Sequence, residues 1–101
     1  MLSKIKGVIV PLITPFDAQG NIITEALKEH VEFLISRGIQ GFFPGGTTGE
    51  GPLLTIKERC FLAEAIVDCV KNRIPVIVHT GALTTRDTIF LTKHARDIGA
   101  Q

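Results

Sequence analysis

The sequence contains no tryptophan and no tyrosine, and neither sign of charge is in excess. Eleven Lys and Arg face ten Asp and Glu, which gives a formal net charge of +1. A protein that binds nucleic acid through its phosphates needs a basic patch, and no run of like charges provides one here. We therefore expect no nucleic-acid partner.

Long hydrophobic runs are also absent. The longest apolar stretch, from Val8 to Ile13, is far shorter than the ~20 residues that cross a bilayer as a helix. Lys4 and Lys6 precede it as in a secretory signal, but no small-residue cleavage site follows, and Thr14-Pro15-Phe16-Asp17 predicts a turn. We expect neither a signal peptide nor a membrane partner.

Cysteine is scarce as well. Cys60 and Cys69 fall in one predicted helix, where their spacing corresponds to roughly 13 Å, whereas a disulfide joins Cα atoms within about 7 Å. Because these two residues cannot pair with each other, we expect a reduced, cytoplasmic protein. No CxxC or HxxxH spacing occurs, so the sequence predicts no metal site.

The chain nevertheless has ample apolar material for a core. Its 101 residues are 45% hydrophobic with a mean hydropathy of +0.30, which excludes disorder and, at this length, two independent domains. Apolar runs predict strands over residues 7–13, 39–43 and 74–79. The first run is continuous rather than alternating, which is typical of a strand buried on both faces of a parallel sheet.

Amphipathic segments alternate with these runs. The first predicted helix covers residues 24–37, with Thr24 as the expected N-cap and Gly38 as the stop. Its apolar face consists of Leu27, Val31, Leu34 and Ile35.

Two further helices follow. Thr55-Ile56-Lys57-Glu58 is a capping box that begins the second, and residues 84–98 form the third, with Gly99 as its stop. The apolar stripe of the second helix consists of Leu62, Ile66, Cys69 and Val70.

The resulting order is β-α-β-α-β-α, with strands roughly 32 to 35 residues apart, the length of a βα unit. This repeat occurs in open doubly wound sheets and in closed eight-fold barrels of about 250 residues. An open three-stranded sheet would leave bare edges. We therefore expect an α/β fold made of the first three βα units of a (β/α)8 TIM barrel. Residues 1–101 would be the amino-terminal part of that single domain, and a self-sufficient small α/β domain is the alternative.

The segment from Phe43 to Pro52 follows the second predicted strand, at the end where both architectures bind ligands. Its glycines let backbone amides approach an anion closely, and Thr47 and Thr48 add hydroxyls. The spacing matches neither a P-loop nor GxGxxG, which favours a small carboxylate over a nucleotide. The alternative is that these glycines only turn the chain between strand and helix.

Gly45-Gly46-Thr47-Thr48-Gly49-Glu50, with Leu12-Ile13-Thr14-Pro15-Phe16 before it and Ile74 to Gly81 after it, resembles the dihydrodipicolinate synthase and N-acetylneuraminate lyase family. The resemblance runs along the whole chain, and the GTTGE segment is among that family's most specific signatures. It implies an eight-fold barrel, usually a homotetramer, that acts as a Schiff-base-forming, pyruvate-dependent aldolase or lyase. The implied substrates are pyruvate and an aldehyde, with no cofactor.

The resemblance also implies site residues. The amides and hydroxyls of Thr47 and Thr48 would hold the carboxylate of pyruvate, and Gly46 would allow its close approach. Thr47 would join the hydroxyl relay that moves protons during Schiff-base formation. The family's Schiff-base lysine and relay tyrosine lie on later segments, and this chain holds neither. Its lysines are expected to be surface charges that leave these 101 residues inactive alone: Lys4, Lys6, Lys28, Lys57, Lys71 and Lys93.

His79 and Glu50 are two further candidates. His79 ends the third predicted strand, where synthases of this family tend to have a small residue and lyases and sugar-acid aldolases accommodate a larger one. It is either a packed, hydrogen-bonded histidine or a residue that faces the substrate. For Glu50 we expect a structural role, with its carboxylate accepting hydrogen bonds from local backbone amides.

A second hypothesis comes from a different class of protein. The chain could be a non-catalytic α/β binding module that assembles with copies of itself to cover its strand edges. Its high apolar content favours this reading, and the intact anion-binding loop argues against it.

Overall fold

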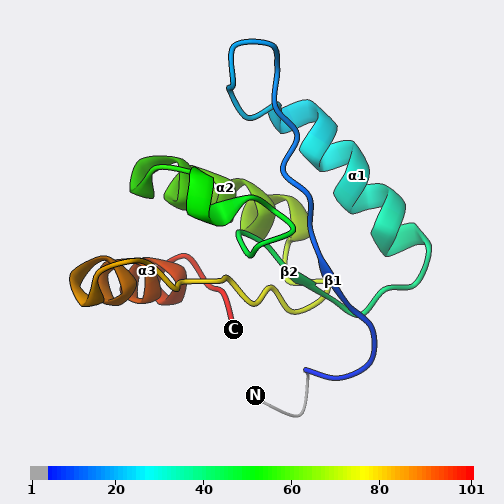
Figure 1. Ribbon diagram of the computed structural model, residues 1–101. Coiled ribbons are helices and arrows are strands. Elements are labelled where there is room, and N and C mark those ends of the chain that lie inside the picture. The colour runs from blue at the N-terminus through cyan, green and yellow to red at the C-terminus, as the bar shows by residue number, and fades with distance from the viewer. Residues whose placement is uncertain (1–4) are drawn as a thin grey trace.

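The computed structural model describes residues 5–101 and shows parallel strands beside a row of three helices (Figure 1). β1 (Ile9–Pro11) and β2 (Gly41–Phe43) pair in parallel, with Val10 opposite Phe42. A helix lies between them in the chain, as parallel pairing of sequential strands requires. The α/β class and the parallel connection predicted from the sequence are confirmed.

The predicted third strand, residues 74–79, runs beside β2 but forms only a single parallel bridge, between Phe42 and Val76. The N–H of Phe42 donates to the carbonyl of Pro75 at 3.0 Å, and the N–H of Ile77 donates to the carbonyl of Phe42 at 2.9 Å. The neighbouring bridges on the two sides would need N–H donors from Pro44 and Pro75, and proline has none. The expectation of a full third strand is therefore wrong, although the segment runs parallel to β2 where that strand was expected.

The helices stand in chain order, so that α2 (Ile56–Val70) lies between α1 (Thr24–Ser36) and α3 (Thr85–Asp97) and contacts both (Figure 1). A short 3-10 helix, η2 (Gly51–Leu53), precedes α2. The core consists of side chains from β2, α1, α2, the residue that follows β1 and the third segment. They are Leu12, Leu27, Val31, Phe42, Leu62, Ile66, Cys69, Val70 and Val76.

The predicted first strand, residues 7–13, is covered on one side only. Leu12 is 1% exposed and packs in the core, whereas Ile13, which points the other way, is 52% exposed. Successive side chains of a strand point to opposite faces, and the helices cover the face of Leu12. The prediction that this strand is buried on both faces is thus wrong for the described chain.

The helix starts show one correct and one incorrect prediction. Thr55 caps α2, because its hydroxyl accepts from the N–H of Glu58 at 3.0 Å while the Glu58 carboxylate accepts from the N–H of Thr55 at 2.8 Å. Thr24 is not the N-cap of α1. That position belongs to Ile23, whose backbone is held extended by a 2.9 Å bond from its N–H to the carbonyl of Pro15.

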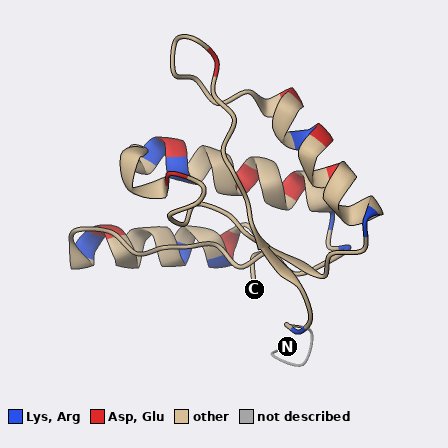
Figure 2. Cartoon of the chain, turned by 45° about the vertical axis from the view of Figure 1, so that its right-hand side comes forward, with Lys and Arg blue, Asp and Glu red and all other residues tan. Residues whose placement is uncertain are grey.

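Charged side chains of both signs lie mainly along the helices, while β1, β2 and the segments that follow them carry few (Figure 2). No helix among residues 5–101 is both long and apolar enough to cross a membrane. Cys60 and Cys69 are both free thiols, as their spacing predicts.

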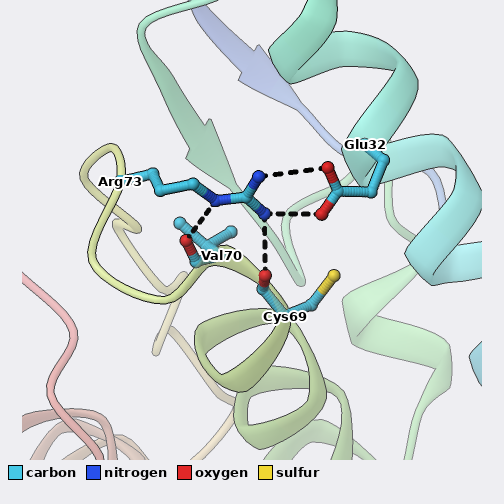
Figure 3. A network of polar contacts seen from close by, with 4 residues as sticks. All are labelled: Glu32, Cys69, Val70 and Arg73. Atoms are coloured by element: carbon cyan, nitrogen blue, oxygen red, sulfur yellow. Dashed lines mark hydrogen bonds and ion pairs between the residues drawn. The ribbon is translucent and has the colours of Figure 1, made fainter.

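Arg73 ties α1 to the end of α2 (Figure 3). Its guanidinium donates to both carboxylate oxygens of Glu32, at 2.6 and 3.1 Å, and to the carbonyls of Cys69 and Val70 at 2.9 and 2.8 Å. The hydrogen bonds from Arg73 lower the pKa of Glu32 below its ordinary value of 4.5.

The capping box yields a stability prediction. We expect Thr55→Ala to lower the free energy of unfolding by about 1 kcal/mol, because it leaves an amide of the first turn without its acceptor. Thr24→Ala is the matched control, and its effect should stay within about 0.5 kcal/mol, since Thr24 caps nothing. Urea unfolding followed by circular dichroism measures both. Equal losses in the two variants would contradict the assignment of the caps.

The Glu32–Arg73 pair yields a pH prediction. Because the folded state lowers the pKa of Glu32, the unfolded chain takes up the proton first, and the stabilisation is present above pH 4.5 and lost as the pH falls further. Glu32→Gln should therefore reduce the acid-side slope of stability against pH. Glu29→Gln, on the same helix but outside the ion pairs of the described residues, should leave the slope unchanged.

Candidate functional site

The loop that follows β2 turns back on itself. The N–H of Glu50 donates to the carbonyl of Thr47, and that of Gly51 donates to the carbonyl of Gly46, both at 3.0 Å. No hydrogen bond between described residues uses the N–H groups of residues 46–49 as donors. The side chains of Thr47 and Thr48 are exposed, and their hydroxyls bond to no described residue. The loop therefore presents backbone and hydroxyl donors together on one short segment.

Thr14, which the sequence did not indicate as a site residue, holds this loop from the segment that follows β1. It is 5% exposed, it follows β1, and its hydroxyl donates to the carbonyl of Gly49 at 2.6 Å. The only signal in the sequence was its place after the first apolar run, since carboxyl ends of parallel strands share one edge. The loop is thus fixed to β1 as well as to β2.

Two glycines of the loop are required by close contacts. A Cβ on Gly46 would lie 2.6 Å from the ring of Phe43, and a Cβ on Gly51 would collide with the carbonyl of Gly45. Gly46 is buried, and its backbone packs against the ring of Phe43. The glycines do turn the chain, as one alternative predicted, and the turn includes residues 46–49, whose N–H groups donate to no described residue.

His79 lies behind the loop and is half-buried. Its N–H donates to the carbonyl of Pro44 at 3.1 Å, and its Nδ1 lies 3.1 Å from the carbonyl oxygen of Gly45. The ring meets Phe43 edge-on, with centroids 5.7 Å apart. The structure thus places His79 as a packed, hydrogen-bonded residue, and a role in facing the substrate stays a prediction.

Arg59 is a second residue that sequence reasoning missed. It is 7% exposed and donates to the carbonyl of Gly81 at 2.7 Å and to that of His79 at 2.8 Å. Burial lowers its pKa. A signal was available, because Arg59 precedes Leu62 by three positions and so falls on the apolar stripe of α2, where a charged residue needs a buried partner.

Glu50 does not play the role that the sequence predicted. Its carboxylate is exposed and accepts no hydrogen bond from the described residues. The backbone explains the position instead, because Glu50 adopts the left-handed conformation (φ 59°) and its N–H closes the turn on Thr47. The expectation of a carboxylate that holds the turn is therefore wrong.

A groove of about 550 Å³ lies beside the loop, between η2 and the start of α3. Arg59, His79, Leu83 and Asp87 help to line it, and Thr47 and Thr48 do not. The exposed threonines of the loop and this groove are therefore separate features.

The remaining titratable residues add little to the site. All lysines among residues 5–101 are exposed, and Lys4 lies outside the described residues. In the same part of the chain no three His, Cys, Asp or Glu side chains lie close enough to hold a metal ion.

Parallel strands, an intervening helix and a loop at the carboxyl end of β2 are the features of a βα-repeat fold, in which ligands bind at that edge of the sheet. The chain matches the family model of the Dihydrodipicolinate synthetase family over residues 4–101, and it belongs to that family. The resemblance stated from the GTTGE segment is confirmed.

Individual relatives agree with this assignment. An uncharacterized DapA-like lyase from Thermococcus onnurineus is 46% identical over 94% of this chain and 32% of its own length. YagE from E. coli K12, a prophage protein of the dihydrodipicolinic acid synthase family solved in complex with pyruvate, is 35% identical over 95% of this chain and 32% of its own, with a TM-score of 0.93. N-acetylneuraminate lyase from Aliivibrio salmonicida is 38% identical over 96% of this chain and 32% of its own length, with a TM-score of 0.91.

The chain therefore spans about a third of the length of these relatives. Its α/β fold matches the corresponding part of theirs, which is consistent with a partial barrel. The similar solved structures include a dihydrodipicolinate synthase, from Bacillus anthracis, as well as the N-acetylneuraminate lyase.

The bond between Thr14 and Gly49 can be tested by an isosteric change. Thr14→Val leaves the carbonyl of Gly49 buried without its donor, and we expect a loss of about 1–3 kcal/mol in the free energy of unfolding. Ser36→Ala removes a hydroxyl-to-carbonyl bond of the same 2.6 Å length at an exposed site and should cost less than about 0.5 kcal/mol. A Thr14→Val protein as stable as wild type would show that Thr14 does not hold the loop.

Proposed function

We propose that residues 1–101 are the amino-terminal part of a (β/α)8 barrel, its first three βα units, in a Schiff-base-forming, pyruvate-dependent aldolase or lyase. The segment supplies the loop that binds the carboxylate of pyruvate. The complete enzyme condenses pyruvate with an aldehyde or cleaves the product, and it assembles as a homotetramer.

One observation carries this proposal. The N–H groups of residues 46–49 have no acceptor among the described residues, and they lie next to two exposed hydroxyls at the carboxyl end of β2. A carboxylate is planar and small, and it accepts two or more such donors at once. Thr47 and Thr48 hold it, and Gly46, where a Cβ would lie 2.6 Å from the ring of Phe43, allows its close approach.

The chemistry explains why a fixed carboxylate matters. A lysine amine attacks the keto carbon of pyruvate, the C=O oxygen leaves as water, and a C=N bond forms. Each step moves a proton, and the hydroxyl of Thr47 takes part in that relay. Binding the carboxylate at the loop orients the ketone toward the amine, which makes an otherwise bimolecular reaction effectively intramolecular.

The lysine and the relay tyrosine belong to the remainder of the barrel. The chain contains no tyrosine, and its described lysines are exposed, on helices or between elements rather than at the carboxyl end of a strand. The relatives are about three times as long, which leaves room for both residues. The solved complex of YagE with pyruvate, at 35% identity, supports pyruvate as the keto substrate.

The test is reductive trapping in the whole protein that the reading frame of this chain encodes. Incubation with pyruvate and borohydride reduces the C=N bond, so one lysine should gain one reduced pyruvyl group by mass spectrometry. The isolated residues 1–101 serve as the control and should gain none. Absence of the adduct on the whole protein would favour the non-catalytic binding module, and stoichiometric trapping on the isolated segment would place the nucleophile within it.

A Thr47 pair refines the same experiment. Thr47→Val should slow trapping about 10²-fold, since it removes a proton-relay hydroxyl, and Thr47→Ser, which keeps the hydroxyl, should stay within about tenfold of wild type. If valine and serine give equal rates, the hydroxyl of Thr47 has no part in the relay.

A further inference from the structure

Arg59 carries a buried positive charge that no described carboxylate neutralises. The ion pairs among residues 5–101 join Arg73 to Glu32, His94 to Glu64 and Arg96 to Asp97, and Arg59 is in none of them. Its two terminal nitrogens donate instead to the backbone carbonyls of Gly81 and His79. A guanidinium so deeply buried is costly, so its partners must be held in place by the fold.

His79 connects this guanidinium to the loop. Its Nδ1 lies 3.2 Å from Nη2 of Arg59 and 3.1 Å from the carbonyl oxygen of Gly45. The guanidinium only donates and the carbonyl only accepts, so Nδ1 bonds to one of them at a time. In either case the ring lies between the two groups and meets Phe43 edge-on, and Arg59 also holds the main-chain carbonyl of His79 at 2.8 Å.

The donor-bearing residues 46–49 are therefore held at both ends. At Gly49 the contact comes from the hydroxyl of Thr14, and at Gly45 it comes from the imidazole of His79 in the tautomer with a proton on Nδ1, while Arg59 holds the main-chain carbonyl of His79. A second bond, from the backbone N–H of His79 to the carbonyl of Pro44, aligns the segment that carries the ring with the start of the loop. Displacing the Gly45 end would move the amides that follow it.

We propose that Arg59 is a positioning residue for pyruvate binding: through the carbonyls of His79 and Gly81 it holds the imidazole of His79 against Gly45 and so fixes the N–H groups of residues 46–49. The inference rests on the proposed function of that loop. Each terminal nitrogen of Arg59 donates to a backbone carbonyl, so in this proposal Arg59 acts through the backbone at His79 and Gly81.

The experiment compares Arg59→Gln and Arg59→Lys in the whole protein, with Arg96→Gln as the matched control. Arg96 is an exposed arginine near the end of α3, paired only with its neighbour Asp97. Steady-state kinetics give KM for pyruvate and kcat separately, and thermal melts report folding. We expect Arg59→Gln to raise KM for pyruvate about tenfold or more while kcat changes less than about threefold, because the carboxylate contacts are the same before and during reaction.

Arg59→Lys should give an intermediate KM, since a lysine keeps the charge but cannot present the planar fork that spans two carbonyls. Arg96→Gln should match wild type. A purely structural role for Arg59 predicts a lower melting temperature and less active enzyme with an unchanged KM, and that result in folded Arg59→Gln would overturn the proposal. Should Arg59→Gln fail to fold, Arg59→Lys decides, and a wild-type KM in that variant overturns it.

The two proposals fail in different ways. If wild-type protein forms no pyruvyl adduct, the proposed function fails, and hydrogen exchange of the amides of Glu50 and Gly51, which are bonded to the carbonyls of Thr47 and Gly46, still measures the effect of Arg59 on the loop. Faster exchange in Arg59→Lys than in wild type supports the positioning role, and unchanged exchange removes it.

Discussion

Parallel pairing of the strands is the constraint on which the rest of the structure depends. Because β1, β2 and the segment 74–79 run in the same direction, the residues that follow each of them meet at one edge. Thr14, the loop 44–51 and His79 come from three distant parts of the sequence and contact one another there. The helices between the strands are what make this direction possible, and α2, the central helix, also contributes Arg59 to the same edge.

The elements with a strong local signal could be predicted from sequence. The reciprocal hydrogen bonds of Thr55 and Glu58 and the apolar stripe of α2 depend on residues a few positions apart, so the sequence specifies them. Thr24 was wrongly predicted as the N-cap of α1 because a tertiary contact overrides its local preference. The bond from the N–H of Ile23 to the carbonyl of Pro15 sets where the helix begins. The third strand was overestimated because its apolar pattern does not show which N–H donors are missing, at Pro75 within the segment and at Pro44 just after β2.

The candidate loop was found from its residue types, but the residues that hold it were not. Thr14 and Arg59 contact the loop or its neighbours across separations that no local pattern encodes. Arg59 was visible only as a polar interruption of an apolar stripe, and Thr14 only by its place after a strand. For Glu50 the sequence predicted a contact that does not form. A carboxylate near free amides suggested a hydrogen bond to them, but the turn is closed by the backbone of Glu50 in its left-handed conformation.

The contact between Gly45 and Gly51 has a consequence for the length of the loop. Surface loops generally tolerate insertions and deletions because their ends can adjust. Here the two glycines lie against each other at the base of the turn, with the carbonyl of one in the space where the other would carry a side chain. An added residue has no room at the base and could only bulge at the tip, among the amides themselves. The number of residues between β2 and η2 is therefore as much a part of the site as their identity.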